Sequence, residues 1–156
     1  MTYLISLEVQ PMGVGEVYEQ LPMHCTIMPR FHSKLSPDVL SGVLAPLIEA
    51  MEPLELQPLE HVAFGPKQQL VTTLVYTPQL RHLHEVLYDA LTKLAVQFTE
   101  VDWVGPGFIP HVSDKKGRRF TTQTLLTSST AYLINFDHPL EGRSRKVVKR
   151  YKLGSV

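Results

Sequence analysis

Two three-residue segments, far apart in the chain, share one composition: a histidine, a residue that suits a core, and a hydroxyl residue. They are His24-Cys25-Thr26 and His111-Val112-Ser113, and their histidines are 87 positions apart. In a β-strand, residues i and i+2 point to the same face. Each segment therefore sets an imidazole beside a hydroxyl on one face of a sheet, while Cys25 and Val112 face the core. The repeat favours a fold in which two such strands face a common site.

The chain has 156 residues, of which 44% are hydrophobic and 19% charged, as in an ordinary globular protein. We expect one domain over residues 1–156. Its single cysteine excludes an internal disulfide and favours a reduced, cytoplasmic setting. No apolar run approaches the roughly 20 residues that span a bilayer. Residues 1–9 lack the basic start and the cleavage site of a signal peptide and are predicted to form a strand.

The charges are segregated along the chain. Residues 1–113 hold 5 Lys/Arg and 12 Asp/Glu, a net charge of −7, whereas residues 114–156 hold 10 Lys/Arg and 3 Asp/Glu, a net charge of +7. A basic segment directly after the second motif suits an anionic ligand, but lysines that protect an edge strand give the same pattern. Both interpretations stay open for Lys115, Lys116, Arg118 and Arg119. The solvent-facing one is favoured for Arg143, Arg145, Lys146, Lys149, Arg150 and Lys152.

Two helices are predicted from their start signals. Ser36-Pro37-Asp38 and Thr77-Pro78 each combine a hydroxyl N-cap with proline at the first helical position. Pro46 should kink or split the first helix. Strands are predicted over residues 3–9, 21–31, 54–64, 69–76, 108–113, 124–136 (as one or two) and 147–153. This order predicts an α+β fold with mainly antiparallel sheet.

Two histidines that face each other have the chemistry for in-line displacement at a phosphodiester. With an ordinary pKa of about 6.5, one imidazole can activate water while the other protonates the leaving oxygen. The hydroxyls of Thr26 and Ser113 can donate to the phosphoryl oxygens. This scheme needs no metal or cofactor, and the sequence offers no obvious carboxylate-rich metal cluster.

With these motifs the sequence resembles the two-histidine (2H) phosphoesterase superfamily, which includes bacterial RNA 2′,5′-ligase-like proteins and cyclic phosphodiesterases. The family signature is a pair of H-x-[ST]-x motifs, here His24-Cys25-Thr26-Ile27 and His111-Val112-Ser113-Asp114. Asp114 departs from the apolar residue usual at that position. The resemblance implies two pseudo-symmetric lobes of mainly antiparallel sheet with outer helices and an active-site groove between them. It also implies metal-independent hydrolysis of a 2′,3′-cyclic or 2′,5′-linked phosphodiester of RNA ends, oligonucleotides or nucleotides.

The resemblance implies four catalytic residues, His24, Thr26, His111 and Ser113, with His111 as the base and His24 as the acid in hydrolysis. The substrate-binding candidates are Lys115, Lys116, Arg118 and Arg119. No metal or cofactor is expected, and the protein is expected to act as a monomer away from membranes. The alternative is a non-catalytic RNA- or nucleotide-binding module on the same scaffold, which the basic C-terminal third supports.

Other residues carry weaker signals. The remaining histidines lack a hydroxyl partner in a credible site strand, and the helical spacing of His82 and His84 puts them on different faces, so no zinc site is expected. Arg30 and Lys67 could reach a phosphate but are expected to face solvent. Aromatic residues that could stack on a base, none of them assigned that role, are Tyr18, Phe64, Trp103, Phe108 and Phe120.

Overall fold

The computed structural model describes residues 1–121, 126–137 and 144–155. Its two α-helices are α1 (Pro37–Glu49) and α2 (Pro78–Lys93). The strands are β1 (Thr2–Glu8), β2 (Val17–Tyr18), β3 (His24–His32), β4 (Leu54–Leu56), β5 (Pro58–Phe64), β6 (Gln69–Leu74), β7 (Gln97–Phe98), β8 (His111–Ser113), β9 (Leu126–Ser128), β10 (Thr130–Asn135) and β11 (Arg145–Lys152). Two short 3-10 helices, Val101–Trp103 and Gly105–Gly107, precede β8.

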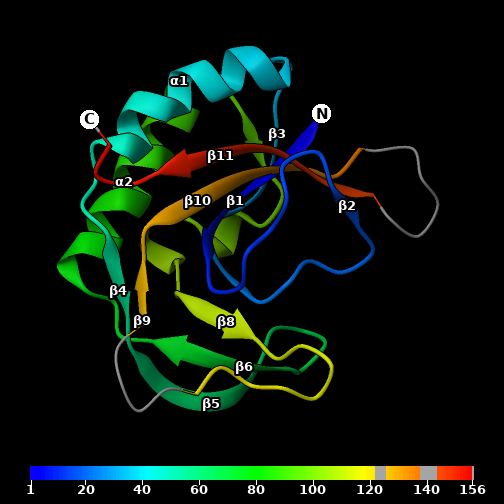
Figure 1. The fold of residues 1–156 in the computed structure, drawn as a ribbon, viewed down its shortest axis with the longest axis vertical. Helices are drawn as coiled ribbons and strands as arrows, with labels where there is room; N and C mark the ends of the chain where they lie inside the picture. Colours follow the sequence, from blue (N-terminus) through cyan, green and yellow to red (C-terminus); the bar gives the residue numbers. More distant parts are fainter. Residues whose placement is uncertain (122–125, 138–143, 156) are drawn as a thin grey trace.

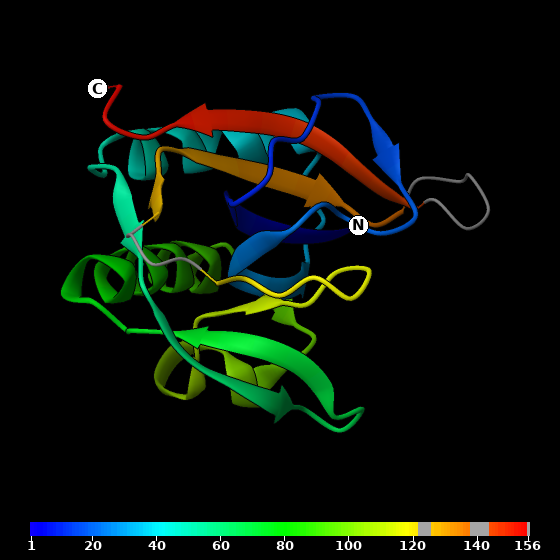
Figure 2. The ribbon, with the colours of Figure 1, turned by 60° about the horizontal axis from the view of Figure 1, so that its bottom comes forward.

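The main sheet runs in the order β2-β11-β10-β1-β3-β8-β6-β5, with β7 added at one end of β3. Every pairing in it is antiparallel, as in the separate two-stranded sheet of β4 and β9. The predicted α+β class with mainly antiparallel sheet is therefore confirmed. Figures 1 and 2 show two groups of strands, one around β1 and β10 and one around β6, which meet where β3 pairs with β8.

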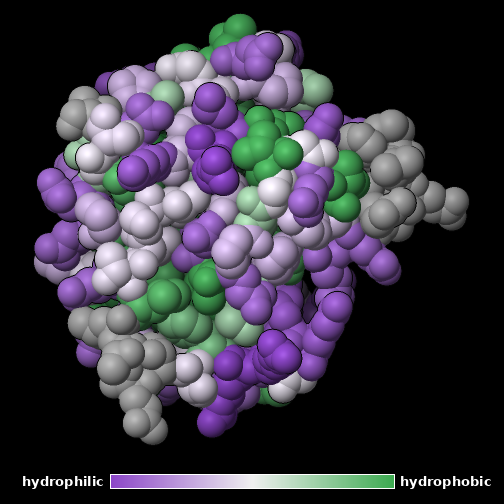
Figure 3. All heavy atoms as spheres, viewed as in Figure 1, coloured by the Kyte–Doolittle hydropathy of each residue, from purple (hydrophilic) through white to green (hydrophobic). Residues whose placement is uncertain are grey.

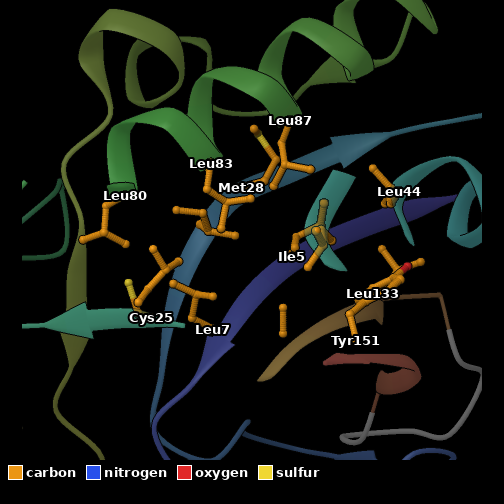
Figure 4. Packing of buried hydrophobic residues seen from close by; sticks show 14 of the residues in the cluster. Ile5, Leu7, Cys25, Met28, Leu44, Leu80, Leu83, Leu87, Leu133 and Tyr151 are labelled. Carbon is orange, nitrogen blue, oxygen red and sulfur yellow. The ribbon is translucent and has the colours of Figure 1, made fainter. Parts of the chain in front are cut away.

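The helices cover one face of this sheet and form the main core with it. Figure 4 shows Leu80, Leu83 and Leu87 of α2 beside strand residues that include Cys25 and Met28, while Leu44 of α1 lies near Leu133 and Tyr151. All of these side chains are fully buried. Each such side chain contributes about 1.5–3 kcal/mol on burial, so this packing fixes the central strands. Within the described residues, no helix is long and apolar enough to cross a membrane.

A smaller core lies on the opposite face of β1 and β10. It combines strand residues with residues of the segment that connects β1 to β3, and its buried members are Leu4, Met12, Leu21, Tyr132, Ile134 and Val147. Tyr132 fixes this segment because its hydroxyl accepts the backbone N–H of Met12 and donates to the Glu8 carboxylate. The second core covers one group of strands and stops short of the β3–β8 junction.

Both predicted helix starts are present. The hydroxyl of Ser36 accepts the backbone N–H of Val39 at 3.3 Å, and the hydroxyl of Thr77 accepts that of Leu80 at 3.2 Å. These bonds satisfy N–H groups that have no partner inside the helix. Local chemistry therefore sets both helices at the positions that the sequence indicates.

Pro46 does not split α1, which runs on to Glu49. Proline cannot donate to the carbonyl four residues earlier, which is that of Gly42. Pro46 and Gly42 both lie on the exposed face of the helix. Water can solvate the unpaired carbonyl there, while Leu40, Leu44 and Ile48 hold the opposite face in the core.

The other differences concern strand limits. The predicted strand over 54–64 divides at Gln57, because β4 pairs with β9 whereas β5 pairs with β6. The two-residue strands β2 and β7 were not predicted, since a ladder this short leaves no sequence pattern. The strand predicted over 108–113 is confined to His111–Ser113, and Phe108 belongs to the preceding turn. Residues 124 and 125 of the predicted strand 124–136 lie outside the described residues.

Candidate active site

The two motif strands are neighbours in the sheet. β3 and β8 run antiparallel, with Cys25 paired to Val112. One step outward in either direction places His24 opposite Ser113 and Thr26 opposite His111. Each histidine therefore lies across from the hydroxyl residue of the other motif.

The pleat separates the two faces of this pair of strands. Cys25 and Val112 are 0% exposed and belong to the main core, as the sequence predicted for Cys25. Their neighbours His24, Thr26, His111 and Ser113 point to the opposite face and are partly exposed. The alternation of the two motifs therefore turns four polar side chains away from the helices.

Both imidazoles are held in the same way. The Nδ1 of His24 lies 2.8 Å from the carbonyl oxygen of Pro22, and the Nδ1 of His111 lies 2.9 Å from that of Ile109. A carbonyl only accepts, so Nδ1 carries a proton in each ring. The Nε2 atom of each neutral ring is then left with a lone pair, available as a base or, once protonated, as an acid.

The histidines open into a cavity of about 620 Å³, within the range of 300–1,000 Å³ that takes up whole small ligands. Thr26 lines it together with both histidines, whereas Ser113 is not among the lining residues. The segment 65–67, which follows β5, forms part of the wall. The remaining lining residues are Leu4, Gln20, Leu21, Pro29, Arg30, Phe64, Gln69, Glu100, Trp103, Phe108, Ile109, Lys115, Phe136 and Arg145.

The two imidazoles differ in their electrostatic surroundings. Burial, with smaller contributions from the charges of Lys115 and His111, lowers the pKa of His24 to about 4, against the opposing bond to Pro22. Burial also lowers the pKa of His111, but the Glu100 carboxylate opposes this shift. The ring of Phe64 packs on His111, with centroids 4.5 Å apart. His24 therefore favours the neutral form more strongly than His111 does.

The predicted substrate-binding residues are divided by the structure. Lys115 lines the cavity and is partly buried, and its pKa is lowered by burial and by the charge of Arg145. Lys116 and Arg118 are exposed in the turn after β8, where Lys115 and Arg118 pair as an isolated bridge. Arg119 lies in a separate small pocket, and its Nη1 is 3.1 Å from the Nδ1 of His61.

Asp114, the departure from the family motif, has a partner. Its carboxylate oxygens lie 3.0 and 3.1 Å from the Nε2 of His61 on β5, which β6 separates from β8 in the sheet. Because Arg119 donates to the other ring nitrogen, His61 links β5 to both ends of the turn that carries Lys115. The polar residue at this position therefore helps to hold Lys115 beside the cavity.

Arg145, Arg30 and Lys67 were expected to face solvent, and all three line the cavity. For Arg145 the expectation was wrong because β11 begins at the cavity with this residue. The Arg145 guanidinium donates there to the carbonyl of Glu19 at 2.7 Å. Arg143 of the same cluster lies outside the described residues. Charge counts along the sequence cannot distinguish the first residue of a strand that borders the cavity from its exposed neighbours.

The aromatic candidates have different locations. Phe64 and Trp103 line the cavity with ring centroids 4.8 Å apart, and Phe108, only 5% exposed, also contributes to its wall. Phe120 is 6% exposed and belongs to the main core. The hydroxyl of Tyr18 donates to Glu16 outside the lining.

His84 supports the site from the core. It is fully buried, its Nδ1–H donates to the carbonyl of Ile27 at 2.8 Å, and its Nε2 accepts the backbone N–H of Gly105 at 2.9 Å. Its ring stacks on Phe108 at 3.9 Å. It thus ties β3 to the segment that leads into His111. The sequence did indicate that His84 is buried, because it follows Leu80 by four residues and lies on the apolar face of α2.

Histidine, cysteine, aspartate and glutamate side chains do not gather in threes suitable for a metal ion anywhere in residues 1–121, 126–137 and 144–155. His138 lies outside these ranges. The polar side chains that converge on the cavity are imidazoles, a hydroxyl and cations, together with the Glu100 carboxylate and two side-chain amides. This set can transfer protons and hold an anion.

No family model and no curated protein matches the sequence. Solved structures do match over nearly the whole chain. Escherichia coli LigT in complex with NADP+ is 12% identical, with 97% of this chain and 96% of that chain covered and a TM-score of 0.60. A protein described as a phosphoesterase is also 12% identical, with 97% and 98% covered and a TM-score of 0.64. The protein TT0787 of Thermus thermophilus is 14% identical, with 99% and 98% covered and a TM-score of 0.57.

Because the identities are this low, these structural matches establish the fold alone. The activity has to be inferred from the residues of the site. The structural likeness extends from end to end of the chain, as the sequence motifs led us to expect. The chain therefore has the α+β fold of the LigT-type phosphoesterases.

Proposed function

We propose that residues 1–156 form one 2H-type phosphodiesterase domain that hydrolyses a 2′,3′-cyclic or 2′,5′-linked phosphodiester of RNA ends, oligonucleotides or nucleotides. One observation carries the proposal. Two histidines with the same Nδ1 anchor lie diagonally across two paired strands and open into one cavity. The end-to-end likeness to LigT, which has been solved with NADP+, 3′-AMP and phosphate, supports the same class of ligand.

The surroundings of the two imidazoles favour a direction of proton transfer. His24, whose pKa is about 4, is neutral and serves as the base, while Glu100 favours the protonated form of His111, which serves as the acid. This reverses the roles that the family resemblance implied. The pair needs no metal to supply either proton-transfer group.

The proposed step is the attack of water on the phosphorus atom of the phosphodiester. The Nε2 of His24 takes a proton from water, and the water oxygen forms a bond to phosphorus. The bond from phosphorus to one ribose oxygen breaks, and that oxygen receives the proton from the Nε2 of His111. The products are a phosphomonoester and a free hydroxyl, or two separate nucleotides when the linkage is 2′,5′.

Three groups are proposed to hold the phosphoryl oxygens during this step. Thr26 supplies a hydroxyl donor that lines the cavity beside the histidines, and Lys115 supplies a cation at the same end. Ser113, opposite His24 but outside the lining, supplies a weaker hydroxyl donor. Donors aimed at developing charge in a partly buried site typically contribute 10²–10³-fold each. The non-reacting part of the substrate occupies the rest of the cavity.

The test is turnover of nucleoside 2′,3′-cyclic phosphates and 2′,5′-linked oligoadenylates in EDTA. We expect a bell-shaped pH profile of kcat/KM, with its acid limb near pH 4 and its alkaline limb below pH 6.5. His24→Ala and His111→Ala should each reduce turnover by roughly 10²–10⁴-fold. His82→Ala, on the exposed face of α2, is the matched control and should change little.

The alternative of a binding module predicts a different result. Salt-dependent RNA affinity that survives His24→Ala, with no turnover of any of these substrates, would favour that module over the enzyme. Full activity in both histidine variants would contradict the proposed mechanism even if the protein hydrolyses the substrates.

A further inference from the structure

The end of the cavity away from β8 holds two arginines on one aromatic ring. The Cζ of Arg145 lies 5.3 Å from the centroid of Phe136, and the Cζ of Arg30 lies 5.7 Å from it. Arg145 is further fixed by its 2.7 Å bond to the carbonyl of Glu19. All three side chains line the cavity. The two guanidinium groups are therefore oriented before any ligand binds.

The charge on the cavity wall is unbalanced. Among its described lining residues there are four cations, Arg30, Lys67, Lys115 and Arg145, and one carboxylate, Glu100. Glu100 pairs with Arg30 at 3.9 Å, and both side chains are nearly half exposed, so this pair is weak. Arg145 and Lys115 are close enough for the charge of one to lower the pKa of the other. An anion between such cations relieves their repulsion.

This end is too distant to serve the reacting phosphate. The β1–β3 register shifts twice in this stretch, so Thr26 and Phe31 pair with Ser6 and Tyr3, only three residues apart on β1. At about 3.3 Å per residue, the backbone of Arg30 therefore lies roughly 10 Å from that of Thr26. Part of this distance is spanned by the long arginine side chain. Phe136 is displaced further, because β1 lies between β10 and β3 and Asn135, next to Phe136, pairs with Tyr3. A single phosphate held by the histidines and Thr26 therefore does not reach the ring of Phe136.

We propose that Arg30, Arg145 and Phe136 form a second phosphate subsite, and that the preferred substrate carries a second phosphate beside the reacting one. This rests on the proposed function, because the histidines define where the first phosphate lies. The guanidinium groups donate to the second phosphate, and Phe136 holds them in place.

The outer face of the molecule carries both hydrophilic and hydrophobic residues. In Figure 3 the hydrophilic residues gather at the lower right, over β5, β6 and the turn after β8.

The second phosphate can come from two sources with the same chemistry. One is the 5′-phosphate of a single nucleotide that ends in a 2′,3′-cyclic phosphate. The other is the phosphodiester that joins the terminal nucleotide to the preceding one in an RNA end. The two differ in charge and in the size of the group beyond the phosphate, so they can be distinguished by substrate choice.

The experiment compares kcat/KM for three substrates: a nucleoside 2′,3′-cyclic phosphate, its 5′-phosphorylated form, and a dinucleotide with a 2′,3′-cyclic end. Each charge-assisted contact is worth roughly tenfold, so at least one of the two larger substrates should exceed the simple one by ten- to a hundredfold. Arg145→Gln should remove about tenfold of this preference, because it reduces kcat/KM for the larger substrates more than for the simple one. Arg30→Gln should remove less, because Glu100 already engages it.

Arg81→Gln is the matched control. Arg81 also lies over an aromatic ring, with its Cζ 4.4 Å from the centroid of Tyr76, but it is exposed on α2 and does not line the cavity. It changes the net charge equally and should alter no substrate preference. A gain with the 5′-phosphorylated mononucleotide identifies the terminal phosphate as the ligand, whereas a gain with the dinucleotide alone identifies the RNA strand.

Equal kcat/KM for all three substrates, or an equal loss for all three in Arg145→Gln, would overturn the subsite and leave the hydrolase intact. If no cyclic substrate turns over, the hydrolase fails, and calorimetry with a nucleoside 3′-phosphate and a nucleoside 3′,5′-bisphosphate still tests the subsite. Tighter binding of the bisphosphate that Arg145→Gln abolishes would support it. Equal affinities of the two ligands would overturn it.

Discussion

The two halves of the candidate site have the same local structure and different surroundings. In each half a histidine donates its Nδ1–H to the carbonyl two residues earlier, and a hydroxyl residue follows two residues later. Around His24 the neighbouring charge is Lys115, whereas around His111 it is Glu100, with Phe64 packed on the ring. The motif fixes the geometry, while burial and, to a smaller extent, residues from other elements separate the pKa values.

The difference indicates how a nearly symmetric pair can have two distinct roles. Base and acid must hold different protonation states at the same pH, which two imidazoles in identical surroundings cannot do efficiently. Lys115 lies in the turn after β8, and Glu100 lies between β7 and the first 3-10 helix. The assignment of roles therefore depends on two segments that have no counterpart in the repeated motif.

The largest expected contrast lies in the two hydroxyl residues. Thr26 lines the cavity and Ser113 does not, although each lies opposite a histidine. We expect Thr26→Val to lower kcat/KM by roughly 10²–10³-fold, as for loss of one donor to developing charge. Ser113→Ala should cost about tenfold or less on the same scale. Steady-state kinetics on a nucleoside 2′,3′-cyclic phosphate measure both.

Equal losses in Thr26→Val and Ser113→Ala would show that the two halves are functionally symmetric despite the difference in lining. Far-ultraviolet circular dichroism of both variants is the control for folding. Because each substitution removes only a hydroxyl or replaces it by a methyl, neither should disturb the β3–β8 pairing. The contrast therefore isolates the position of the oxygen relative to the cavity.

Much of the fold could be predicted because its determinants are local. Ser36 and Thr77 cap their helices as expected, and the alternation around Cys25 and Val112 places both motifs on one face. The short strands β2 and β7 could not be predicted, since they exist only through pairing with distant strands. Pro46 does not split α1, because it lies opposite the buried residues Leu40, Leu44 and Ile48, which hold the helix in the core.

The sequence predicts the part of the candidate site that comes from the two similar histidine motifs. The four motif residues follow from spacing alone, but Glu100, Arg145 and Phe136 reach the cavity through tertiary packing. Nothing in the local sequence of Arg145 separates it from the exposed lysines of β11. The anchor carbonyls of Pro22 and Ile109 are backbone groups, which have no sequence signal at all.

The two histidines should also differ in how they make the stability of the protein depend on pH. Burial holds the pKa of His24 at about 4, below its ordinary value of 6.5. In the interval between these values the unfolded chain binds a proton that the folded chain does not, so the free energy of unfolding falls as the pH falls. At 1.36 kcal/mol per pKa unit, His24 accounts for about 3 kcal/mol of this loss between pH 7 and pH 4. His24→Gln should remove that part of the pH dependence.

Urea denaturation at pH 7 and pH 4 measures the effect. His111→Gln should remove a smaller part, since Glu100 opposes the shift of its pKa. The buried His84 also contributes to acid sensitivity, so some pH dependence remains in both variants. The same pH dependence in His24→Gln as in the natural chain would mean that His24 is charged in the folded protein, and the proposed roles would then have to be exchanged.

The smallest expected effect most directly tests the roles of base and acid. Glu100→Gln removes the charge that favours protonated His111 and should lower the His111 pKa further. If His111 is the acid, kcat/KM at pH 7.5 falls about threefold, because fewer molecules carry its proton. If His24 is the acid instead, the fraction of molecules with protonated His24 and neutral His111 at that pH depends on the His24 pKa alone. Glu100→Gln then leaves kcat/KM unchanged.

Glu55→Gln on β4, exposed and outside the cavity, is the matched control. A threefold fall confined to Glu100→Gln thus assigns the proton to His111, whereas an unchanged rate would return the roles to those that the family resemblance implied.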